Sequence, residues 1–222
     1  MLNNQRLLAC AGYVSGKGIA CDVGTDHAYL AAYLVKSGKC GFVIASDVKD
    51  GPLLSAKATI EKYGISDKVM LVKSDGLDNI PPDNVSDVII AGMGAELICS
   101  IIEKAPWLKN GVNLILQPMT RAPFLRRWLC QNGYETDAET AVKDSRFFYA
   151  IIKAHYTGIS HTPDEVFENI GKMDLSDDVS REYAKKQAER LFKAGKGMLE
   201  ATGGETNSAL ETAQKIKKLL EG

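Results

Sequence analysis

Acidic residues follow three short apolar runs in the first third of the chain. The first run, residues 19–22, leads into Asp22-Val23-Gly24-Thr25-Asp26-His27. The second run ends at Ser46-Asp47-Val48, and the third is followed by Ser74-Asp75-Gly76. If the runs are parallel strands, these carboxylates lie along one edge of a sheet, where α/β proteins bind their ligands.

The loop around Gly24 stands where a nucleotide-binding glycine loop would stand, but it is not G-x-G-x-x-G. Its flanking residues, Asp22 and Asp26, are carboxylates, so a dinucleotide pyrophosphate would meet negative charge. A cationic ligand suits this loop, and S-adenosylmethionine carries both a sulfonium and an ammonium group. The alternative is that Asp26 only caps the helix that follows, as aspartate often does.

The next two acids have the spacing expected for contacts to a nucleoside. Asp47 follows Asp22 at about the offset of a ribose-binding acid, and its carboxylate could accept both ribose hydroxyl protons, with Val48 beside it. Asp75 could accept from an adenine amino group while Gly76 allows close backbone approach. Asp-Gly is also a common turn, so this last pair is weak evidence by itself.

A fourth apolar run leads into Ala91-Gly92-Met93-Gly94. We expect Gly92 and Met93 to form the floor of the site beside a methyl group in transfer. The alternative for Met93 is ordinary core packing.

Composition describes an ordinary globular chain of 222 residues, with 45% hydrophobic and 25% charged residues. Lys and Arg total 27 against 28 Asp and Glu, so a uniformly basic nucleic-acid binder is excluded. No apolar run approaches the roughly 18–20 residues of a membrane helix, and no signal peptide is visible at the start. Five widely spaced cysteines without a C-x-x-C pair predict reduced thiols, a cytoplasmic location and no metal site.

Strand-like and helix-like patterns alternate through the first two thirds of the chain. The predicted strands are residues 19–22, 42–46, 69–72, 88–91 and 112–116, and the predicted helices are 28–36, 53–63, 96–104 and 123–131. This alternation predicts an α/β fold with a doubly wound, mostly parallel sheet. Residues 134–141 and 147–156 read as a hairpin, so at least one strand should run antiparallel.

The pattern changes after residue 157, which divides the chain into an expected Rossmann-like domain, 1–157, and a helical subdomain, 158–222. Helical spacing covers residues 179–199, Gly203-Gly204 forms a break, and Leu210, Ala213, Ile216 and Leu220 form a second apolar stripe. The prediction is a helical hairpin or short coiled coil. It could contact RNA, or it could simply pack on the sheet or on a second subunit as a weak homodimer of an otherwise monomeric chain.

Four motifs together resemble one family: Asp22-Val23-Gly24-Thr25-Asp26-His27-Ala28-Tyr29-Leu30, Ala45-Ser46-Asp47-Val48 with Gly51-Pro52-Leu53, Ala91-Gly92-Met93-Gly94, and Leu114-Ile115-Leu116-Gln117-Pro118. The chain resembles the bacterial tRNA adenine-22 N1-methyltransferases, the TrmK family, over nearly its whole length. It departs from the family pattern at Ala31, where proline is expected, and at Ala95, where a second glycine is expected.

The resemblance implies a class I methyltransferase fold, S-adenosylmethionine as methyl donor and tRNA as partner, with an adenine of the D-arm as acceptor. Residues carried over to the cofactor pocket are Asp22, Gly24, Asp26, His27, Asp47, Asp75, Gly76, Gly92 and Met93. Asp26 is expected to stabilise the cationic product, and His27 to orient the base or accept a proton. Tyr29 could stack on the base, although packing against the sheet is the alternative.

A local basic cluster offers contacts for RNA phosphates despite the balanced total charge. Its residues are Arg121, Arg126, Arg127, Lys143 and Arg146, with Arg6 and Lys17 as possible additions. For Arg126 and Arg127 the alternative is a solvated helix face. Three other functions remain open at this point: a nicotinamide oxidoreductase, a methyltransferase of another RNA position or of a small molecule, and a silent binding module.

Overall fold

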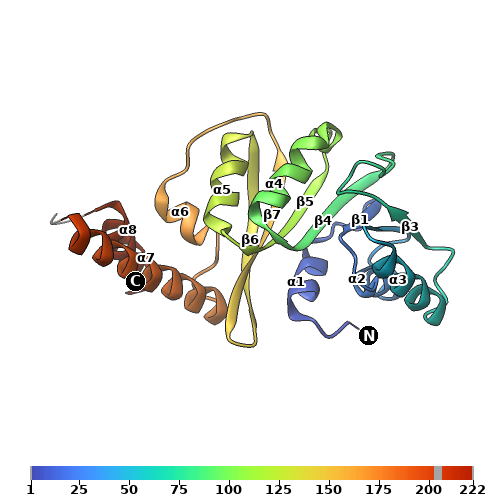
Figure 1. Ribbon diagram of the computed structural model, residues 1–222, viewed down its shortest axis with the longest axis horizontal. Coiled ribbons are helices and arrows are strands. Elements are labelled where there is room, and N and C mark those ends of the chain that lie inside the picture. The colour runs from blue at the N-terminus through green and yellow to red at the C-terminus, as the bar shows by residue number, and fades with distance from the viewer. Residues whose placement is uncertain (1, 203–206, 222) are drawn as a thin grey trace.

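The computed structural model describes residues 2–202 and 207–221, and a seven-stranded sheet forms its centre (Figure 1). The strands are β1 Ile19–Val23, β2 Val43–Asp47, β3 Val69–Lys73, β4 Val85–Gly94, β5 Asn113–Thr120, β6 Tyr134–Asp144 and β7 Phe147–Tyr156. Their spatial order is β3-β2-β1-β4-β5-β7-β6. Strands β1 to β5 pair in parallel, while β7 is antiparallel to both of its neighbours. The predicted doubly wound sheet is confirmed, and its antiparallel hairpin strand lies inside the sheet between β5 and β6.

Helices cover both faces of this sheet. They are α1 Gln5–Tyr13, α2 Tyr29–Lys36, α3 Asp50–Lys62, α4 Ala95–Lys104, the 3-10 helix η1 Pro106–Lys109, α5 Ala122–Gln131, α6 Glu165–Ile170, α7 Asp178–Thr202 and α8 Ser208–Glu221. Apolar side chains of α1, α2 and α3 pack on one face, and those of α4 and α5 pack on the other. Helices α1 and α6 were not predicted. Helix α1 begins after Asn4, whose side chain accepts hydrogen bonds from the backbone N–H groups of Arg6 and Leu7.

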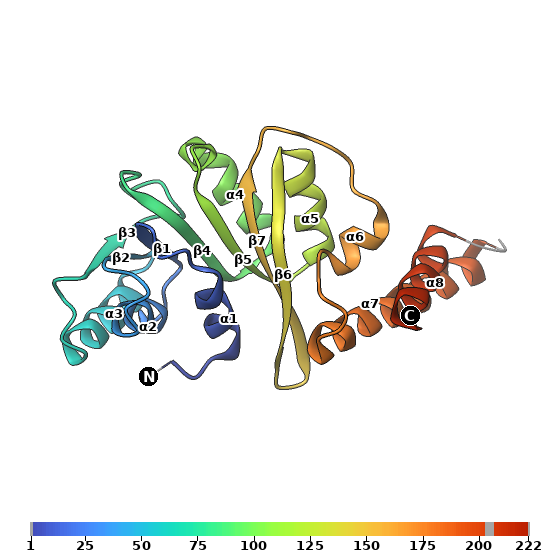
Figure 2. The ribbon, with the colours of Figure 1, turned by 180° about the vertical axis from the view of Figure 1, so that it is seen from behind.

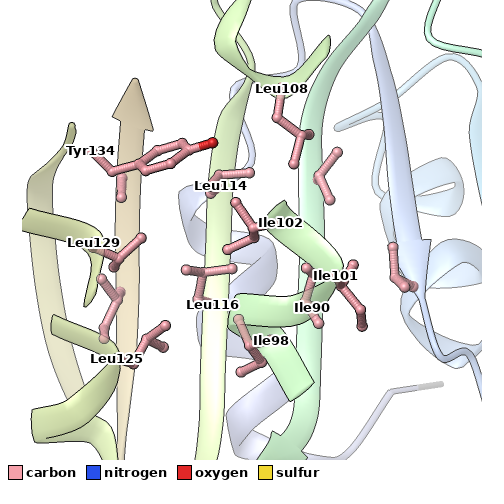
Figure 3. Packing of buried hydrophobic residues seen from close by; sticks show 14 of the residues in the cluster. Ile90, Ile98, Ile101, Ile102, Leu108, Leu114, Leu116, Leu125, Leu129 and Tyr134 are labelled. Atoms are coloured by element: carbon pink, nitrogen blue, oxygen red, sulfur yellow. The ribbon is translucent and has the colours of Figure 1, made fainter. Parts of the chain in front are cut away.

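Alternating side chains of the central strands enter two separate cores. Ile89 belongs to the cluster under α1, α2 and α3, whereas Ile90 belongs to the cluster under α4 and α5. On the second face Ile90 packs with Ile98 and Ile102 of α4 (Figure 3). Because both faces are covered, the strands are nearly continuous apolar runs, which is why they were visible in the sequence.

The C-terminal helices project away from the sheet (Figure 2). Helices α7 and α8 run antiparallel, since Arg181 near the start of α7 donates a hydrogen bond to the carbonyl of Leu220 near the end of α8. Together with α6 they have their own apolar cluster, made of Ile170, Ala184, Ala188, Leu191, Ala213 and Ile216. The predicted helical hairpin is confirmed, while the predicted break at Gly203-Gly204 lies outside the described residues.

Two features are absent from the described residues, 2–202 and 207–221. No helix in them is long and apolar enough to cross a membrane. They hold no group of three or more His, Cys, Asp or Glu side chains that could bind a metal ion. All five cysteines are buried free thiols, and burial raises the pKa of Cys10 to about 12.

Candidate functional site

A cavity of about 720 Å³ opens at the carboxyl ends of β1 and β4. Strand β1 lies between β2 and β4, and the order of the strands reverses there. This is the switch point at which doubly wound sheets bind ligands. The lining comes from the N-terminal segment, the loop after β1, the end of β4 and the tip of the β6–β7 hairpin. Residues 91–94 at the end of β4 pair irregularly with β5, and we call this segment the β4 loop. The predicted residues on the wall are Asp22, Gly24, Asp26, His27 and Gly92.

The loop after β1 brings a buried carboxylate to the cavity. Asp22 is only 6% exposed, and its carboxylate accepts a hydrogen bond from the Thr25 hydroxyl at 2.8 Å. Burial raises the pKa of Asp22 to about 6, because the ionised form is poorly solvated there. Gly24 has a φ of +78°, so the turn after β1 favours glycine. The terminal methyl of Met93 packs across Gly24 from the β4 loop, a contact that the flexible methionine side chain could relieve by moving.

Asp26 and His27 stand at the mouth of the cavity. The carboxylate of Asp26 is 81% exposed and lies 3.4 Å from Nε2 of His27. The backbone N–H of Ala28, just before α2, donates instead to the Thr25 hydroxyl. The alternative that Asp26 caps this helix is therefore wrong. Tyr29 is 47% exposed and stacks on His27 with ring centroids 5.3 Å apart, so its alternative, packing against the sheet, is also wrong.

Asp47 and Asp75 continue along the same edge but lie outside the lining of the cavity. The ends of β2 and β3 are joined there, since the N–H of Ser74 donates to the carbonyl of Asp47 at 3.0 Å. One carboxylate oxygen of the half-buried Asp47 accepts from the N–H of Lys49 at 2.8 Å, and Val48 beside it is exposed. The three acids thus follow one edge, as predicted.

Gly76 has a structural reason of its own. Its φ is +57°, and a Cβ there would lie 2.9 Å from a side-chain carbon of Ile101 in α4. This close packing requires glycine whether or not the backbone also approaches an adenine ring.

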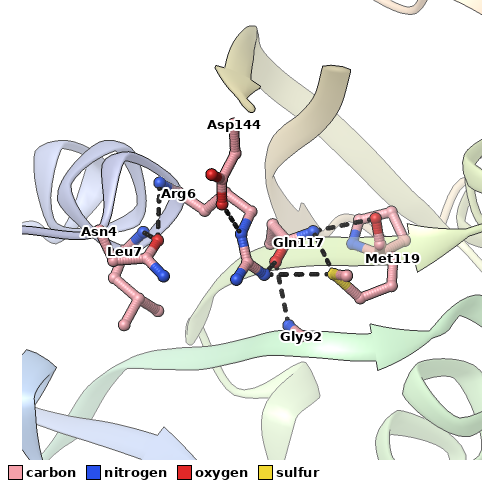
Figure 4. Close-up of polar contacts among 8 residues, drawn as sticks. Asn4, Arg6, Leu7, Gly92, Gln117, Met119 and Asp144 are labelled. Carbon is pink, nitrogen blue, oxygen red and sulfur yellow. Dashed lines mark hydrogen bonds and ion pairs between the residues drawn. The ribbon is translucent and has the colours of Figure 1, made fainter. Parts of the chain in front are cut away.

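The β4 loop is held by a buried amide whose role the sequence did not identify (Figure 4). Gln117 in β5 is fully buried, and its Oε1 accepts from the N–H of Gly92 at 3.1 Å and from Nη1 of Arg6 at 3.0 Å. Nε of Arg6 donates to the Asp144 carboxylate at 3.1 Å. Arg6, considered above only as a contact for RNA, instead contacts the wall of the cavity. The sequence did carry a signal for Gln117, since it is a polar residue at the end of a buried apolar strand.

The prediction that Arg126 binds RNA is wrong. Its guanidinium is completely buried in an ion pair with Glu139 at 2.8 Å, and Nη1 donates to the carbonyls of Glu168 at 2.8 Å and Asn169 at 3.1 Å. Burial disfavours the charged guanidinium, but the Glu139 carboxylate outweighs it and raises the pKa of Arg126 above its ordinary value. Arg126 points into the protein and joins α5 to β6 and α6. The next residue, Arg127, points outward.

The other predicted arginines remain accessible. Arg121 lies next to the carboxyl end of β5 and pairs with Glu96, and Arg127 is 51% exposed and pairs with Glu168 at 2.5 Å. Arg146 at the hairpin tip places its guanidinium 5.0 Å from the ring centroid of Phe147. Lys17 precedes β1 and thus lies at the opposite edge of the sheet, so its inclusion near the site was wrong.

A second cavity of about 630 Å³ separates the hairpin and α5 from the C-terminal helices. Arg121 and Arg127 line it together with Arg190 of α7, which the sequence did not single out. Phe124, Phe148 and Tyr149 supply aromatic surface to the same cavity. Cations next to aromatic rings are the side chains that proteins use to hold single-stranded nucleic acid.

Comparison with known proteins agrees with this geometry. A family model described as a methyltransferase domain matches residues 3–152. The tRNA (adenine(22)-N(1))-methyltransferase of Bacillus subtilis (strain 168) is 34% identical over 165 residues, which cover 71% of this chain and 69% of the relative.

Solved structures extend the similarity over the whole chain. The crystal structure of the B. subtilis m1A22 tRNA methyltransferase TrmK is 28% identical, with a TM-score of 0.79, and covers 99% of this chain and 96% of that one. Sp1610 of Streptococcus pneumoniae, solved in complex with S-adenosyl-L-methionine, is 31% identical, with a TM-score of 0.82, over 97% of this chain and 99% of that one. With its carboxylate-lined cavity at the switch point, this chain belongs to the TrmK family of tRNA (adenine(22)-N(1))-methyltransferases.

Proposed function

We propose that this protein transfers a methyl group from S-adenosylmethionine to N1 of adenine 22 in the D-arm of tRNA. Residues 1–157 form the methyltransferase domain, and the helices of residues 158–222 help to hold the RNA. The observation that carries the proposal is the cavity at the switch point, whose wall holds Asp22 and Asp26 beside the open loop at Gly92. Its volume is in the range of small-molecule sites, and its charge suits a cation.

The residues present fit S-adenosylmethionine in charge and in their order along the edge of the sheet. Asp22 and the backbone around Gly24 would hold the cationic methionine end, because both line the cavity and Asp22 supplies a carboxylate there. Asp47 has one carboxylate oxygen engaged by Lys49 and can accept ribose hydroxyls with the other, next to Val48. Asp75 and Gly76 would meet the adenine end, and Gly92 and Met93 would border the transferring methyl.

The chain's own part in the reaction is alignment and charge stabilisation. Bound S-adenosylmethionine supplies an electrophilic methyl group, and N1 of adenine has an in-plane lone pair that needs no base. Holding the base in line with the methyl therefore supplies most of the acceleration. Asp26 would offset the positive charge that the methylated adenine acquires, and His27, 3.4 Å from Asp26, would orient the base or accept a proton.

The RNA reaches this site from the edge where the β6–β7 hairpin projects. Its target base must leave the stack to expose N1, and the exposed stack of His27 and Tyr29 offers it a surface. Arg121, Arg127 and Arg146 would contact phosphates on that side. The apolar stripes of α7 and α8 face each other and α6, which favours a monomer over a dimer through these helices. As a tRNA-modifying enzyme, the protein would act in the cytoplasm.

Methyl transfer to defined tRNA transcripts tests the function. Purified protein and radiolabelled S-adenosylmethionine are incubated with a tRNA that has adenine at position 22 and with the same tRNA carrying guanine there. We expect label only in the first transcript, mapped to N1 of adenine 22. Label in both transcripts would identify another position, and transfer to neither, at any salt or magnesium concentration, would contradict the proposal. Binding of NADH but not of S-adenosylmethionine would favour the oxidoreductase alternative.

Replacing Asp47 by asparagine tests the ribose contact. The asparagine oxygen can still accept from the N–H of Lys49, so the local turn is kept while the charge is lost. We expect affinity for S-adenosylmethionine to fall by about 1.5–3 kcal/mol, the range for a hydrogen bond to a charged group, as measured by calorimetry. Asp50→Asn removes an exposed carboxylate that pairs with Lys73 nearby and should bind like the wild type. If Asp47→Asn bound S-adenosylmethionine as tightly as Asp50→Asn does, Asp47 would not contact the ligand.

A further inference from the structure

One arginine near the N-terminus is fixed by four partners from three strands and lies against the β4 loop. Arg6 donates from Nε to Asp144, from Nη1 to Oε1 of Gln117, and from Nη1 to the sulfur of Met119 at 3.2 Å. Its guanidinium carbon also lies 5.3 Å from the ring centroid of Tyr149. The Arg6 side chain is only 19% exposed, and Asp144 neutralises its charge, so the wall next to a cation site gains no net positive charge.

The amide of Gln117 transmits this contact to the loop that borders the reaction. Its single oxygen accepts from both Arg6 and the N–H of Gly92, while its nitrogen donates to the carbonyl of Pro118 at 3.0 Å. Both ends of the amide are therefore occupied, which fixes its orientation. Gly92 itself has a φ of +81°, a region that glycine enters freely, so the loop has little intrinsic preference for this conformation. An external hydrogen bond must select it.

We infer that Arg6 is a positioning residue for methyl transfer: acting through Gln117, it holds the loop at Gly92 in the conformation that the reaction uses. Arg6 comes from helix α1, which reaches the site from far away in the sequence (Figure 4). Lysine cannot replace it fully, because a single ammonium lacks the planar fork that reaches Asp144 and Gln117 together. This inference rests on the proposed function and adds a residue to that site.

The test separates positioning from mere support of the fold. Arg6→Met, Arg6→Lys and Gln117→Met are compared with wild type at saturating tRNA and S-adenosylmethionine. We expect Arg6→Met to lower kcat by about 10- to 100-fold, as for a misplaced reacting group, with little change in the KM for S-adenosylmethionine. Arg6→Lys should recover part of the rate. The double variant Arg6→Met/Gln117→Met should be no slower than the slower single variant, because both changes remove the same contact to the loop.

The matched control is a variant that destabilises α1 but changes no residue that lines the cavity. Val14 is buried at the end of that helix and packs in the α1–α3 core, so Val14→Ala should lower the melting temperature and keep kcat. Amide exchange at Gly92, measured without ligands, provides a readout independent of activity: it should accelerate in Arg6→Met and remain unchanged in Val14→Ala. If Arg6→Met fails to fold, Asp144→Ala removes the acceptor of Nε of Arg6 instead, and it should also accelerate exchange at Gly92.

Three results would overturn the inference: wild-type kcat in folded Arg6→Met, multiplicative rate losses in the double variant, or unchanged exchange at Gly92. These results differ from a failure of the proposed function, in which the wild-type enzyme itself would not methylate adenine 22.

Discussion

Arg126→Met is expected to destabilise the fold by about 3–5 kcal/mol, the usual cost of removing one partner of a buried ion pair. The Glu139 carboxylate would be left buried without a counter-charge, and the carbonyls of Glu168 and Asn169 would lose their donor. Chemical denaturation followed by circular dichroism measures the loss. Replacing both charges, as in Arg126→Met/Glu139→Leu, should recover much of it, because no uncompensated charge remains.

The adjacent arginine is the matched control for this result. Arg127→Met removes a pair whose arginine is 51% exposed but whose Glu168 side chain is only 5% exposed, so we expect it to destabilise the fold, though by less than Arg126→Met. Its effect should appear in tRNA binding, as a smaller dependence of affinity on salt. Folded Arg126→Met, studied at low temperature, should bind tRNA like the wild type. A wild-type stability for Arg126→Met with a reduced salt dependence would show that Arg126 contacts RNA after all.

Asp22→Asn is expected to reduce affinity for S-adenosylmethionine by about 1.5–3 kcal/mol, because it removes a buried negative charge facing a cation. The geometry of the loop should survive, since the asparagine oxygen can accept the Thr25 hydroxyl in place of the carboxylate. Calorimetric titration at pH 7.5 measures the change. Wild-type affinity in the Asn variant would mean that Asp22 holds the loop and does not meet the ligand's charge.

The same substitution should stabilise the ligand-free protein at neutral pH. Burial raises the pKa of Asp22 from 3.8 to about 6, so the folded state holds its proton more tightly than the unfolded chain does. Stability from this group therefore falls as pH rises between about 4 and 6, and it stays low above that window. The Asn variant lacks this decrease, and we expect it to exceed the wild type by up to about 3 kcal/mol at pH 7. Thermal denaturation across pH 4–8 checks the sign.

Cofactor affinity should follow the same ionisation in the opposite direction. Only ionised Asp22 attracts the cation, so affinity of the wild type should rise as pH increases through about 6, and that of Asp22→Asn should not. His27 lines the same cavity as Asp22, so its contribution is tested separately. The pH series is therefore repeated with His27→Gln, which should retain the rise due to Asp22. A rise that disappears in His27→Gln would assign the pH dependence to the histidine.

Local sequence patterns determined most of the secondary structure. The strand β7 was predicted at its observed limits, Phe147–Tyr156, because a mostly apolar run begins and ends there at polar turns. The central strands were visible because both faces of the sheet are buried, which makes each a short apolar run between turn residues. Helix α6 was missed because six residues are too few to establish a helical period. Helix α1 was missed although Asn4 marks its start.

The sequence by itself also determined that acids follow three successive strands, and therefore that the site is anionic. Parallel strands end at the same edge of a sheet, so Asp22, Asp47 and Asp75, which follow three such strands, lie along one edge. Only the tertiary structure decided which arginine is a surface residue. Arg126 and Arg127 are consecutive, but successive helix positions point about 100° apart, and the packing of β6 and α6 buries one of them. Likewise, Arg6 and Gln117 stand 111 positions apart, and no local pattern predicts a hydrogen bond across that separation. It exists because β5 and α1 meet at the same edge of the folded sheet.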